Sequence, residues 1–117
     1  MSFRRISLDG RLTVIAAPHP PTDDGLPSDR LQVLHWRVDE PFADDVTHFH
    51  RDSDEVYVVL EGAVELEVDG VPVVVPAGEA VTVAAGVPHA LVAVRRPARG
   101  LTVRGPAGDD KVVTGFR

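Results

Sequence analysis

The alternation of apolar and polar residues predicts β-strands along almost the whole chain. Short segments rich in valine and leucine alternate with turns of Gly, Pro and Asp, and no stretch of about 11 residues or more has the apolar spacing of a helix. We expect strands over residues 12–17 and 31–39, separated by a proline-rich loop over residues 18–30. The pattern therefore predicts an all-β fold.

The clearest local pattern is a hairpin over residues 64–75, VELEVDGVPVVV. Asp69 and Gly70 are residue types that accept the positive φ angles of a two-residue hairpin turn. The register of that turn pairs Val68 with Val71, Leu66 with Val73 and Val64 with Val75. Because side chains alternate between the faces of a strand, one face should be apolar core, while the other carries Glu65 and Glu67 and should be exposed.

The run VYVVL at residues 56–60 is apolar at every position, so both of its faces should be covered. The N-terminal arm or another subunit would supply the cover, and a late strand over residues 110–117 could pair across a two-fold axis, so we expect a homodimer. About ten short strands fit the chain length, and closing them into a barrel would hide the sheet edges. The side chains expected inside are Tyr57, Val59, Val64, Leu66, Val68, Val71, Val73, Val75 and Leu91.

Composition restricts the chemistry and the partners of such a fold. A chain of 117 residues fits one domain over residues 1–117, with residues 1–30 as an N-terminal strand and loop. No cysteine is present, so any metal ion would be held by nitrogen and oxygen. A net charge of -6 argues against a nucleic-acid partner. Without a signal peptide or a membrane-length apolar run, we expect a cytoplasmic protein and no membrane partner.

Two of the five histidines lie one residue apart in THFHRDSDE, residues 47–55. Successive side chains of a strand point to opposite faces, so His48 and His50 share one face. Glu55 opens the next strand, and its carboxylate reaches the histidine pair if the two strands are antiparallel neighbours. A buried carboxylate is costly unless a cation or hydrogen-bond donors compensate it, and a divalent metal ion would do so best.

A fourth ligand would have to come from a distant part of the sequence. His89 follows a Gly-Val-Pro corner and is the only histidine after His50. Three neutral imidazoles and one carboxylate suit Fe, Mn, Ni, Co, Cu or Zn, and the ligand types alone do not choose among these ions. Four protein ligands on an octahedral ion would leave two positions open, which indicates chemistry or ligand binding rather than a purely structural metal.

At these residues the chain resembles the cupin family. HFHRDSDEVYVVLEG looks like the first cupin motif, G(X)5HXH(X)3-4E(X)6G, through His48, His50, Glu55 and Gly62. GEAVTVAAGVPH is similar to the second motif, G(X)5PXG(X)2H(X)3N, through Gly78, Gly86 and His89. Residues 42–93 span both motifs. Phe42, Ala84 and Ala93 stand where the motifs have glycine, proline and asparagine, and none of the three is a ligand position.

The resemblance implies a double-stranded β-helix, or jelly-roll barrel, in a single cupin domain, with His48, His50, Glu55 and His89 as metal ligands. Cupins with this ligand set include dioxygenases, isomerases, decarboxylases and lyases. We therefore expect a metal-dependent enzyme that acts on a small organic molecule, with a dioxygenase as the first hypothesis. The alternatives are an isomerase or lyase, and a non-enzymatic module that binds a small molecule or a metal, such as a sensor or an accessory protein.

Other side chains are candidates for roles around the metal. Tyr57, the only tyrosine, shares a face with Glu55 by alternation and could be a catalytic acid, a base or a hydrogen-bond donor; the alternative is an aromatic lining residue whose hydroxyl bonds a backbone carbonyl. The cations that could meet an anionic substrate are Arg37, Arg95 and Arg104. We expect Trp36 in the core or an interface, and His35 as a hydrogen-bonded or exposed imidazole.

Overall fold

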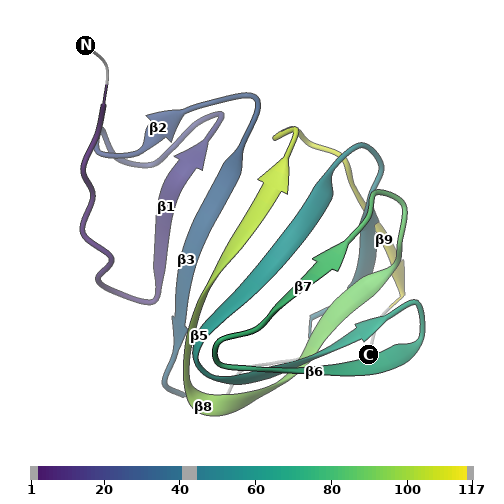
Figure 1. Ribbon diagram of the computed structural model, residues 1–117. Coiled ribbons are helices and arrows are strands. Elements are labelled where there is room, and N and C mark those ends of the chain that lie inside the picture. The colour runs from purple at the N-terminus through teal and green to yellow at the C-terminus, as the bar shows by residue number, and fades with distance from the viewer. Residues whose placement is uncertain (1–2, 41–44, 116–117) are drawn as a thin grey trace.

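The computed structural model describes residues 3–40 and 45–115, and this part of the chain contains nine strands and no helix. The strands are β1 (Leu12–Ala17), β2 (Leu26–Pro27), β3 (Gln32–Val38), β4 (Thr47–His50), β5 (Asp54–Val68), β6 (Val71–Pro76), β7 (Ala80–Val83), β8 (His89–Gly105) and β9 (Lys111–Gly115). They curl around a common interior (Figure 1). The all-β prediction is therefore confirmed.

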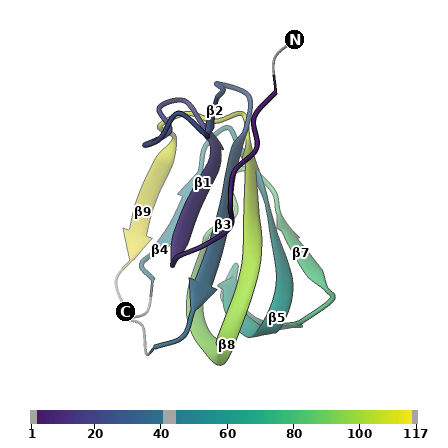
Figure 2. The same cartoon turned by 90° about the vertical axis from the view of Figure 1, so that its left-hand side faces the viewer.

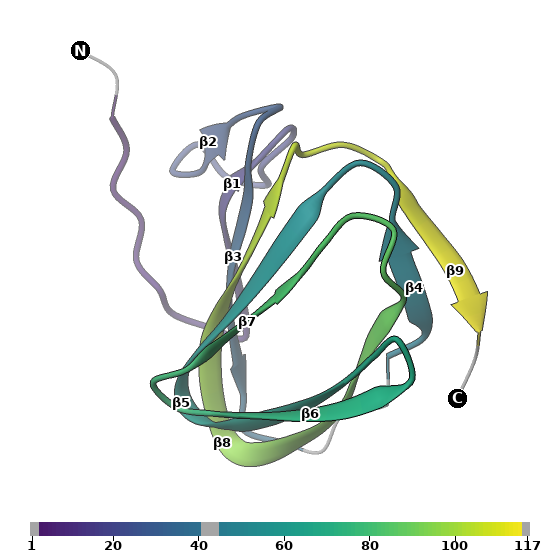
Figure 3. The same cartoon turned by 45° about the vertical axis from the view of Figure 1, so that its right-hand side comes forward.

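Two long, bent strands build most of the barrel. β5 has 15 residues and β8 has 17, and they pair antiparallel over nearly their whole lengths. We expected shorter strands, with the run 56–60 separate from the hairpin. The chain continues instead through Gly62, whose φ of +73° and missing side chain let β5 turn close to the carbonyl oxygens of Arg95 and Pro97. Each long strand thus contributes to both ends of the barrel (Figure 3).

The remaining strands are arranged around this pair. The main path of the sheet runs β2-β1-β3-β8-β4-β9, while β5 joins β8 and also carries β6 and β7. β1 and β3 lie on one side of β8, and the short strand β4 lies between β8 and β9 (Figure 2). This order matters for function because it brings β4, near the middle of the chain, beside the start of β8 and the late strand β9.

The hairpin of β5 and β6 has the predicted register. Val68 pairs with Val71, Leu66 with Val73 and Val64 with Val75, and both turn residues, Asp69 and Gly70, have positive φ. The buried core consists of Val59, Val64, Leu66 and Val75. The expectation that the whole apolar face would be interior is wrong at the turn, where Val71 is 58% exposed although its partner Val68 is half-buried.

The outward face of β5 is only partly covered. Tyr57 and Val59 point inward, whereas Val56 and Val58 point outward and stay half-buried beside β7 and β8. Phe42 and residues 116–117 lie outside the described residues, so the part of the late strand that the structure describes ends at Gly115. Among the described residues, no helix has the length and apolarity that a membrane crossing needs.

Candidate metal centre

Three strands carry the four side chains that the sequence singled out. His48 and His50 lie two residues apart on β4 and point to the same side, as alternation requires. His89 is the first residue of β8 and pairs directly with His48 across the two strands. Glu55 lies at the start of β5, two positions before Tyr57. The structure therefore brings the distant His89 next to the local His48 and His50 pair.

The four side chains meet at one point inside the barrel. One ligand atom from each of His48, His50, Glu55 and His89 can be chosen so that all four atoms lie within 4.8 Å of one another. All four residues are buried, with exposed fractions between 1% for His89 and 8% for His50. Burial of three imidazoles and a carboxylate at such spacing is the arrangement that transition-metal sites use.

The hydrogen bonds of the rings fit a metal site. Nδ1 of His48 donates to the carbonyl of Val46 at 2.9 Å, and Nδ1 of His89 donates to the carbonyl of Val87 at 3.0 Å. Nδ1 of His50 donates to Oδ1 of Asp110 at 2.8 Å. Because an acceptor holds each Nδ1–H, the Nε2 atom is the one left to face the cluster. Metal-binding histidines are usually held in this way by their second nitrogen.

Glu55 joins the cluster through its carboxylate. Its Oε1 lies 2.8 Å from Nε2 of His89 and 3.8 Å from Nε2 of His50, and it accepts a hydrogen bond of 3.2 Å from the Tyr57 hydroxyl. At 2.8 Å, a proton lies between Oε1 of Glu55 and Nε2 of His89. A divalent ion bound at the cluster would take the place of this proton and bind both atoms. The donor set, its burial and the orientation of the rings therefore all fit a divalent transition-metal ion.

The environment shifts the pKa values of three of these groups. Burial raises the pKa of Glu55, but the hydrogen bond from His89 and the neighbouring imidazoles outweigh it, so that the pKa is lowered. Burial opposes the charge on His89, yet its hydrogen bond to Glu55 raises its pKa. The pKa of His48 is lowered, chiefly by burial, with smaller contributions from His89 and Lys111. Glu55 and His89 thus stabilise each other as an ion pair.

Asp110 forms a second, buried layer behind His50. Its Oδ1 accepts from Nδ1 of His50 at 2.8 Å and from Nη1 of Arg104 at 3.0 Å. Its Oδ2 accepts from the Ser53 hydroxyl at 2.6 Å and from the backbone N–H groups of Ser53 and Asp52. Although burial raises the pKa of Asp110, these donors hold it far below its usual range. A permanent carboxylate therefore fixes the ring of His50.

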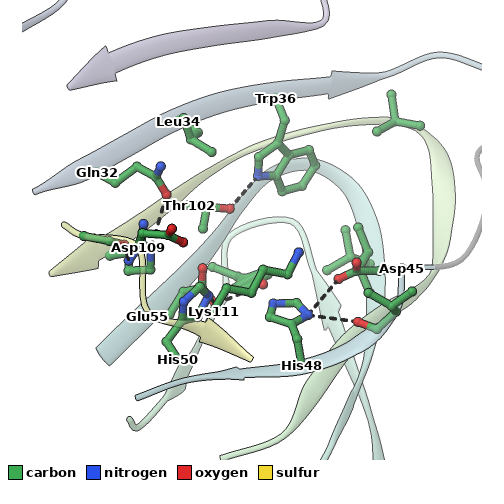
Figure 4. Close-up of a pocket in the computed structure, with 17 residues that line it drawn as sticks. Gln32, Leu34, Trp36, Asp45, His48, His50, Glu55, Thr102, Asp109 and Lys111 are labelled. Atoms are coloured by element: carbon green, nitrogen blue, oxygen red, sulfur yellow. Dashed lines mark hydrogen bonds and ion pairs between the residues drawn. The ribbon is translucent and has the colours of Figure 1, made fainter. Parts of the chain in front are cut away.

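The cluster opens into a cavity of about 770 Å³, large enough for a small organic molecule. Figure 4 shows His48, His50, Glu55 and Lys111 on one side of this cavity and Leu34 and Trp36 on the other. The indole N–H of Trp36 donates to the Thr102 hydroxyl at 3.0 Å, which fixes the ring in the wall. The apolar lining residues are Leu34, Trp36, Val38, Val46, Val64 and Leu91.

The interior differs in part from the expectation. Of the residues expected to point inward, Tyr57, Val64 and Leu91 line the cavity, while Val59, Leu66 and Val75 fill the core beneath it. Tyr57 bonds Glu55 rather than a backbone carbonyl, and burial, with the Glu55 carboxylate, raises its pKa well above the ordinary value. Trp36 contacts the core, as expected, but also lines the cavity.

The three arginines proposed as substrate contacts are placed differently. Arg37 and Arg95 are exposed and do not line the cavity. Arg104 lines it, but its guanidinium is engaged by Asp110, by Ser53, by Gln32 and by the carbonyl of Gly108. His35 is fully buried outside the cavity. Its ring is hydrogen-bonded, as expected, because Nε2 accepts from Nη1 of Arg99 at 3.5 Å, while its Nδ1 has no partner among the described residues.

Sequence reasoning missed Asp110 and Lys111. Both belong to the segment GDDKVV at residues 108–113, which reads as a polar turn followed by a late strand. Asp110 is 60 residues from His50, and only the pairing of β9 with β4 brings them together. The one signal in the sequence was the cluster of charged residues before the apolar strand. Such a cluster is common in surface turns, so it does not indicate a buried carboxylate.

Comparison with known proteins agrees with the fold. A model of the cupin domain family matches residues 36–104, which include all four residues of the cluster. No curated protein matches the sequence significantly. Solved structures that resemble the chain include KdgF from Halomonas sp., with 21% identity over 85% of this chain and 80% of that chain and a TM-score of 0.66.

Two further structures share the architecture at low identity. The Streptomyces protein Pac13, described as a nucleoside dehydratase, has 18% identity over 80% of this chain and 75% of its own, with a TM-score of 0.65. An uncharacterised Klebsiella pneumoniae protein with a double-stranded β-helix domain has 19% identity over 76% of this chain and 74% of its own, with a TM-score of 0.63. At these identities the likeness concerns the fold, and it confirms the predicted jelly-roll barrel.

Proposed function

Because the chain belongs to the cupin domain family, we propose that it is a metal-dependent enzyme that acts on a small organic molecule, with the ion held by His48, His50, Glu55 and His89. One observation carries the proposal: a buried cluster of three imidazoles and a carboxylate opens directly into a cavity of about 770 Å³. A purely structural ion would be enclosed by protein ligands, whereas here a small molecule can reach the cluster.

The bound ion would supply Lewis acidity to a coordinated oxygen and, in a redox-active metal, electrons for reaction with dioxygen. The protein would supply the rest. The wall around Trp36 would bind the apolar part of the substrate and exclude water from it. Asp110 and the carbonyls of Val46 and Val87 would keep the three rings oriented toward the same point.

The reaction class we test first is a dioxygenase, because an accessible site with three histidines and one carboxylate suits iron and related redox-active ions. The second candidate is a lyase or isomerase. It is favoured by Tyr57, whose hydroxyl lies 3.2 Å from Glu55 and whose raised pKa keeps it protonated at neutral pH. A protonated phenol beside the substrate is a proton donor, which an elimination or an isomerisation needs.

The test begins with elemental analysis of protein purified without a metal-chelating tag. The apo protein is then loaded under anaerobic conditions with Fe(II), Mn(II), Ni(II), Co(II), Cu(II) or Zn(II), and each form is assayed against a panel of small molecules with and without oxygen. A dioxygenase turns over only with oxygen and consumes it in proportion to product. A lyase or isomerase gives product in both conditions. A thermal shift on ligand addition without product, for every ion, would favour the non-enzymatic binding module.

A matched pair of variants locates the site. Glu55→Ala removes one of the four candidate ligands, whereas Glu65→Ala removes a carboxylate from the outward face of the same strand. We expect Glu55→Ala to lower metal affinity by at least about tenfold and Glu65→Ala to leave it unchanged. Wild-type metal affinity in Glu55→Ala would exclude Glu55 as a ligand and contradict the proposed centre.

A further inference from the structure

Lys111 is the only lysine among the twelve basic residues of the chain, and it lines the cavity. It opens β9, and in the antiparallel ladder with β4 it pairs directly with His50. Directly paired residues of two strands point to the same face, so the lysine is on the side of the sheet that carries the metal cluster. Figure 4 shows its side chain extending above His48, with its end between His48 and Trp36 in that view.

The ammonium group of Lys111 is the cation of the cavity that remains free to bind a ligand. Of the two cationic residues in the lining, Arg104 is committed to Asp110 and its neighbours. Within residues 3–40 and 45–115, the side chain of Lys111 makes no hydrogen bond or ion pair. Lys111 is an exposed residue, so solvent reaches its ammonium group at the cavity wall, and an anionic group on a ligand would accept a charge-assisted hydrogen bond from it.

The other residues that line the cavity indicate what kind of molecule would carry this anionic group. Opposite the metal cluster, Leu34, Trp36 and Val38 form an apolar wall, and the indole of Trp36 is held in place by Thr102. A fixed indole favours a flat, apolar group packed against it. Asp45 and Asp109 also line the cavity, and their charges oppose a ligand with more than one negative charge. A phosphate group, which usually recruits several cations, therefore fits less well than a carboxylate.

We propose that the cavity takes a small organic acid, whose carboxylate binds Lys111 while an oxygen of the ligand reaches the metal centre and its flat apolar body packs against Trp36. This inference rests on the proposed metal centre and adds the substrate class to it. Lysine suits the role because its compact ammonium group on a flexible stem follows a carboxylate more freely than the planar guanidinium of arginine.

The test uses the protein loaded with Zn²⁺, which has no redox chemistry that would consume the ligand. Lactate, mandelate and salicylate are each titrated calorimetrically, together with the uncharged lactamide, mandelamide and salicylamide. Benzylamine and phenyl phosphate serve as cationic and dianionic probes. Because zinc itself prefers a carboxylate to an amide, the decisive comparison is between the wild type and Lys111→Met rather than between acid and amide alone.

We expect Lys111→Met to weaken the binding of mandelate or salicylate by about tenfold or more, while amide binding stays within about twofold. Lys111→Arg keeps the charge and should retain most of the affinity for the acid. Arg95→Met removes one positive charge from an exposed position outside the cavity and should bind the acids like the wild type. Equal acid affinity in the wild type and Lys111→Met would overturn the inference, as would tighter binding of benzylamine or phenyl phosphate than of every acid.

Chemical modification gives a second measurement that needs no substitution. Because Lys111 is the only lysine, amine-directed reagents change this side chain and the α-amino group alone. Reductive dimethylation keeps the positive charge and acetylation removes it. We expect acetylated protein to lose acid binding by about tenfold and dimethylated protein to keep most of it, with peptide mass spectrometry reporting modification at residue 111. Unchanged acid binding after complete acetylation of Lys111 would also overturn the inference.

The order of the measurements separates this inference from the proposed function. Zn²⁺ binding to the apo protein is titrated first, and its absence would overturn the metal centre together with the inference built on it. Zn²⁺ binding in the wild type and in Lys111→Met, followed by equal acid affinities, would overturn only the assignment of Lys111. Zn²⁺ binding without binding of any acid in the panel would overturn the proposed substrate class and leave the metal centre standing.

Discussion

Asp110 links the candidate metal centre to the end of the described chain. Its carboxylate holds the Nδ1–H of His50 and is itself held by Arg104 and by Ser53. Such a carboxylate orients the ring, fixes which nitrogen carries the proton and makes Nε2 a stronger donor to the metal. At the corresponding atom His89 has a carbonyl acceptor, and His48 has a carbonyl at 2.9 Å with the carboxylate of Asp45 farther away at 3.5 Å, so His50 is the candidate ligand that a carboxylate holds at the shortest distance.

Asp110→Asn should weaken metal binding by about 10- to 100-fold, since the amide can occupy the same space but carries no charge. Isothermal titration with Zn²⁺ measures the affinity, and the absorption spectrum of the Co(II) form reports the ligand geometry, which a general loss of stability would not alter. Asp109→Asn is the matched control, because it removes the same charge from the adjacent, exposed residue. If the two variants bound Zn²⁺ equally well, Asp110 would have no part in positioning His50.

Metal affinity should fall with decreasing pH, because each imidazole must be neutral to bind. Burial works against a proton on His89, but its hydrogen bond to Glu55 raises the pKa, so proton competition at this ring begins above the ordinary value of about 6.5. The pKa of His48 is lowered, chiefly by burial, so protons compete with the metal for this ring only in more acidic solution. Zn²⁺ titrations from pH 8 to 5.5 should show an affinity that decreases progressively across this range. A flat profile would contradict histidine ligation.

At the scale of elements, the bend of β5 at Gly62 keeps the two ends of the strand in one barrel. Gly62 and Gly70 both have positive φ, at +73° and +79°. A side chain at Gly62 would also overlap the carbonyl oxygens of Pro97 and Arg95, whereas one at Gly70 would meet open space. The two glycines therefore separate the cost of the backbone angle from the cost of close packing.

Gly62→Ala should lower the free energy of unfolding by roughly 2–5 kcal/mol, since the strain of a left-handed residue adds to overpacking. Gly70→Ala should cost roughly 1–2 kcal/mol from the angle alone. Urea unfolding of the apo proteins measures both changes. Equal losses in the two variants would mean that the approach of β8 to Gly62 does not constrain the bend.

The sequence predicted those elements whose information is local. The turn at Asp69 and Gly70 fixes the register of the hairpin, and the spacing of His48, His50 and Glu55 gives their shared side. Asp110 and Lys111 could not be predicted, because no local pattern states that β9 pairs with β4. The same holds for Trp36, whose period-2 position indicates burial but does not distinguish a packed core from the wall of a cavity.

At the scale of the whole molecule, a bound ion would cross-link β4, β5 and β8, which are distant in sequence. An ion that binds only the folded state adds about 2.7 kcal/mol to the free energy of unfolding when its concentration is 100 times its Kd. For a domain of this size that corresponds to an increase in Tm on the order of 10 °C. Scanning calorimetry with Zn²⁺ should show this increase, and EDTA should reverse it. Mg²⁺, which prefers oxygen ligands, is the control and should leave Tm unchanged.

The half-buried outward face of β5 bears on the assembly of the molecule. Val58 lies in a row with Ala80 on β7 and Leu101 on β8, and Val56 lies beside Val103, so the outer surface of these three strands is largely apolar. A second copy related by a two-fold axis would cover this row with the same row of its partner. We therefore predict that the protein is a homodimer through this face.

Light scattering coupled to size exclusion should give the mass of a dimer for the wild type and of a monomer for Val58→Lys, because a stable interface cannot bury an unpaired ammonium group. Val74→Lys is the matched control: Val74 is 63% exposed on the outward face of the hairpin, away from the row around Val58, and its replacement should leave the dimer intact. A wild-type monomer at micromolar concentration would contradict the prediction. A dimer that survives Val58→Lys but dissociates on Val113→Lys would place the interface on the edge strand β9, where Val113 is 45% exposed.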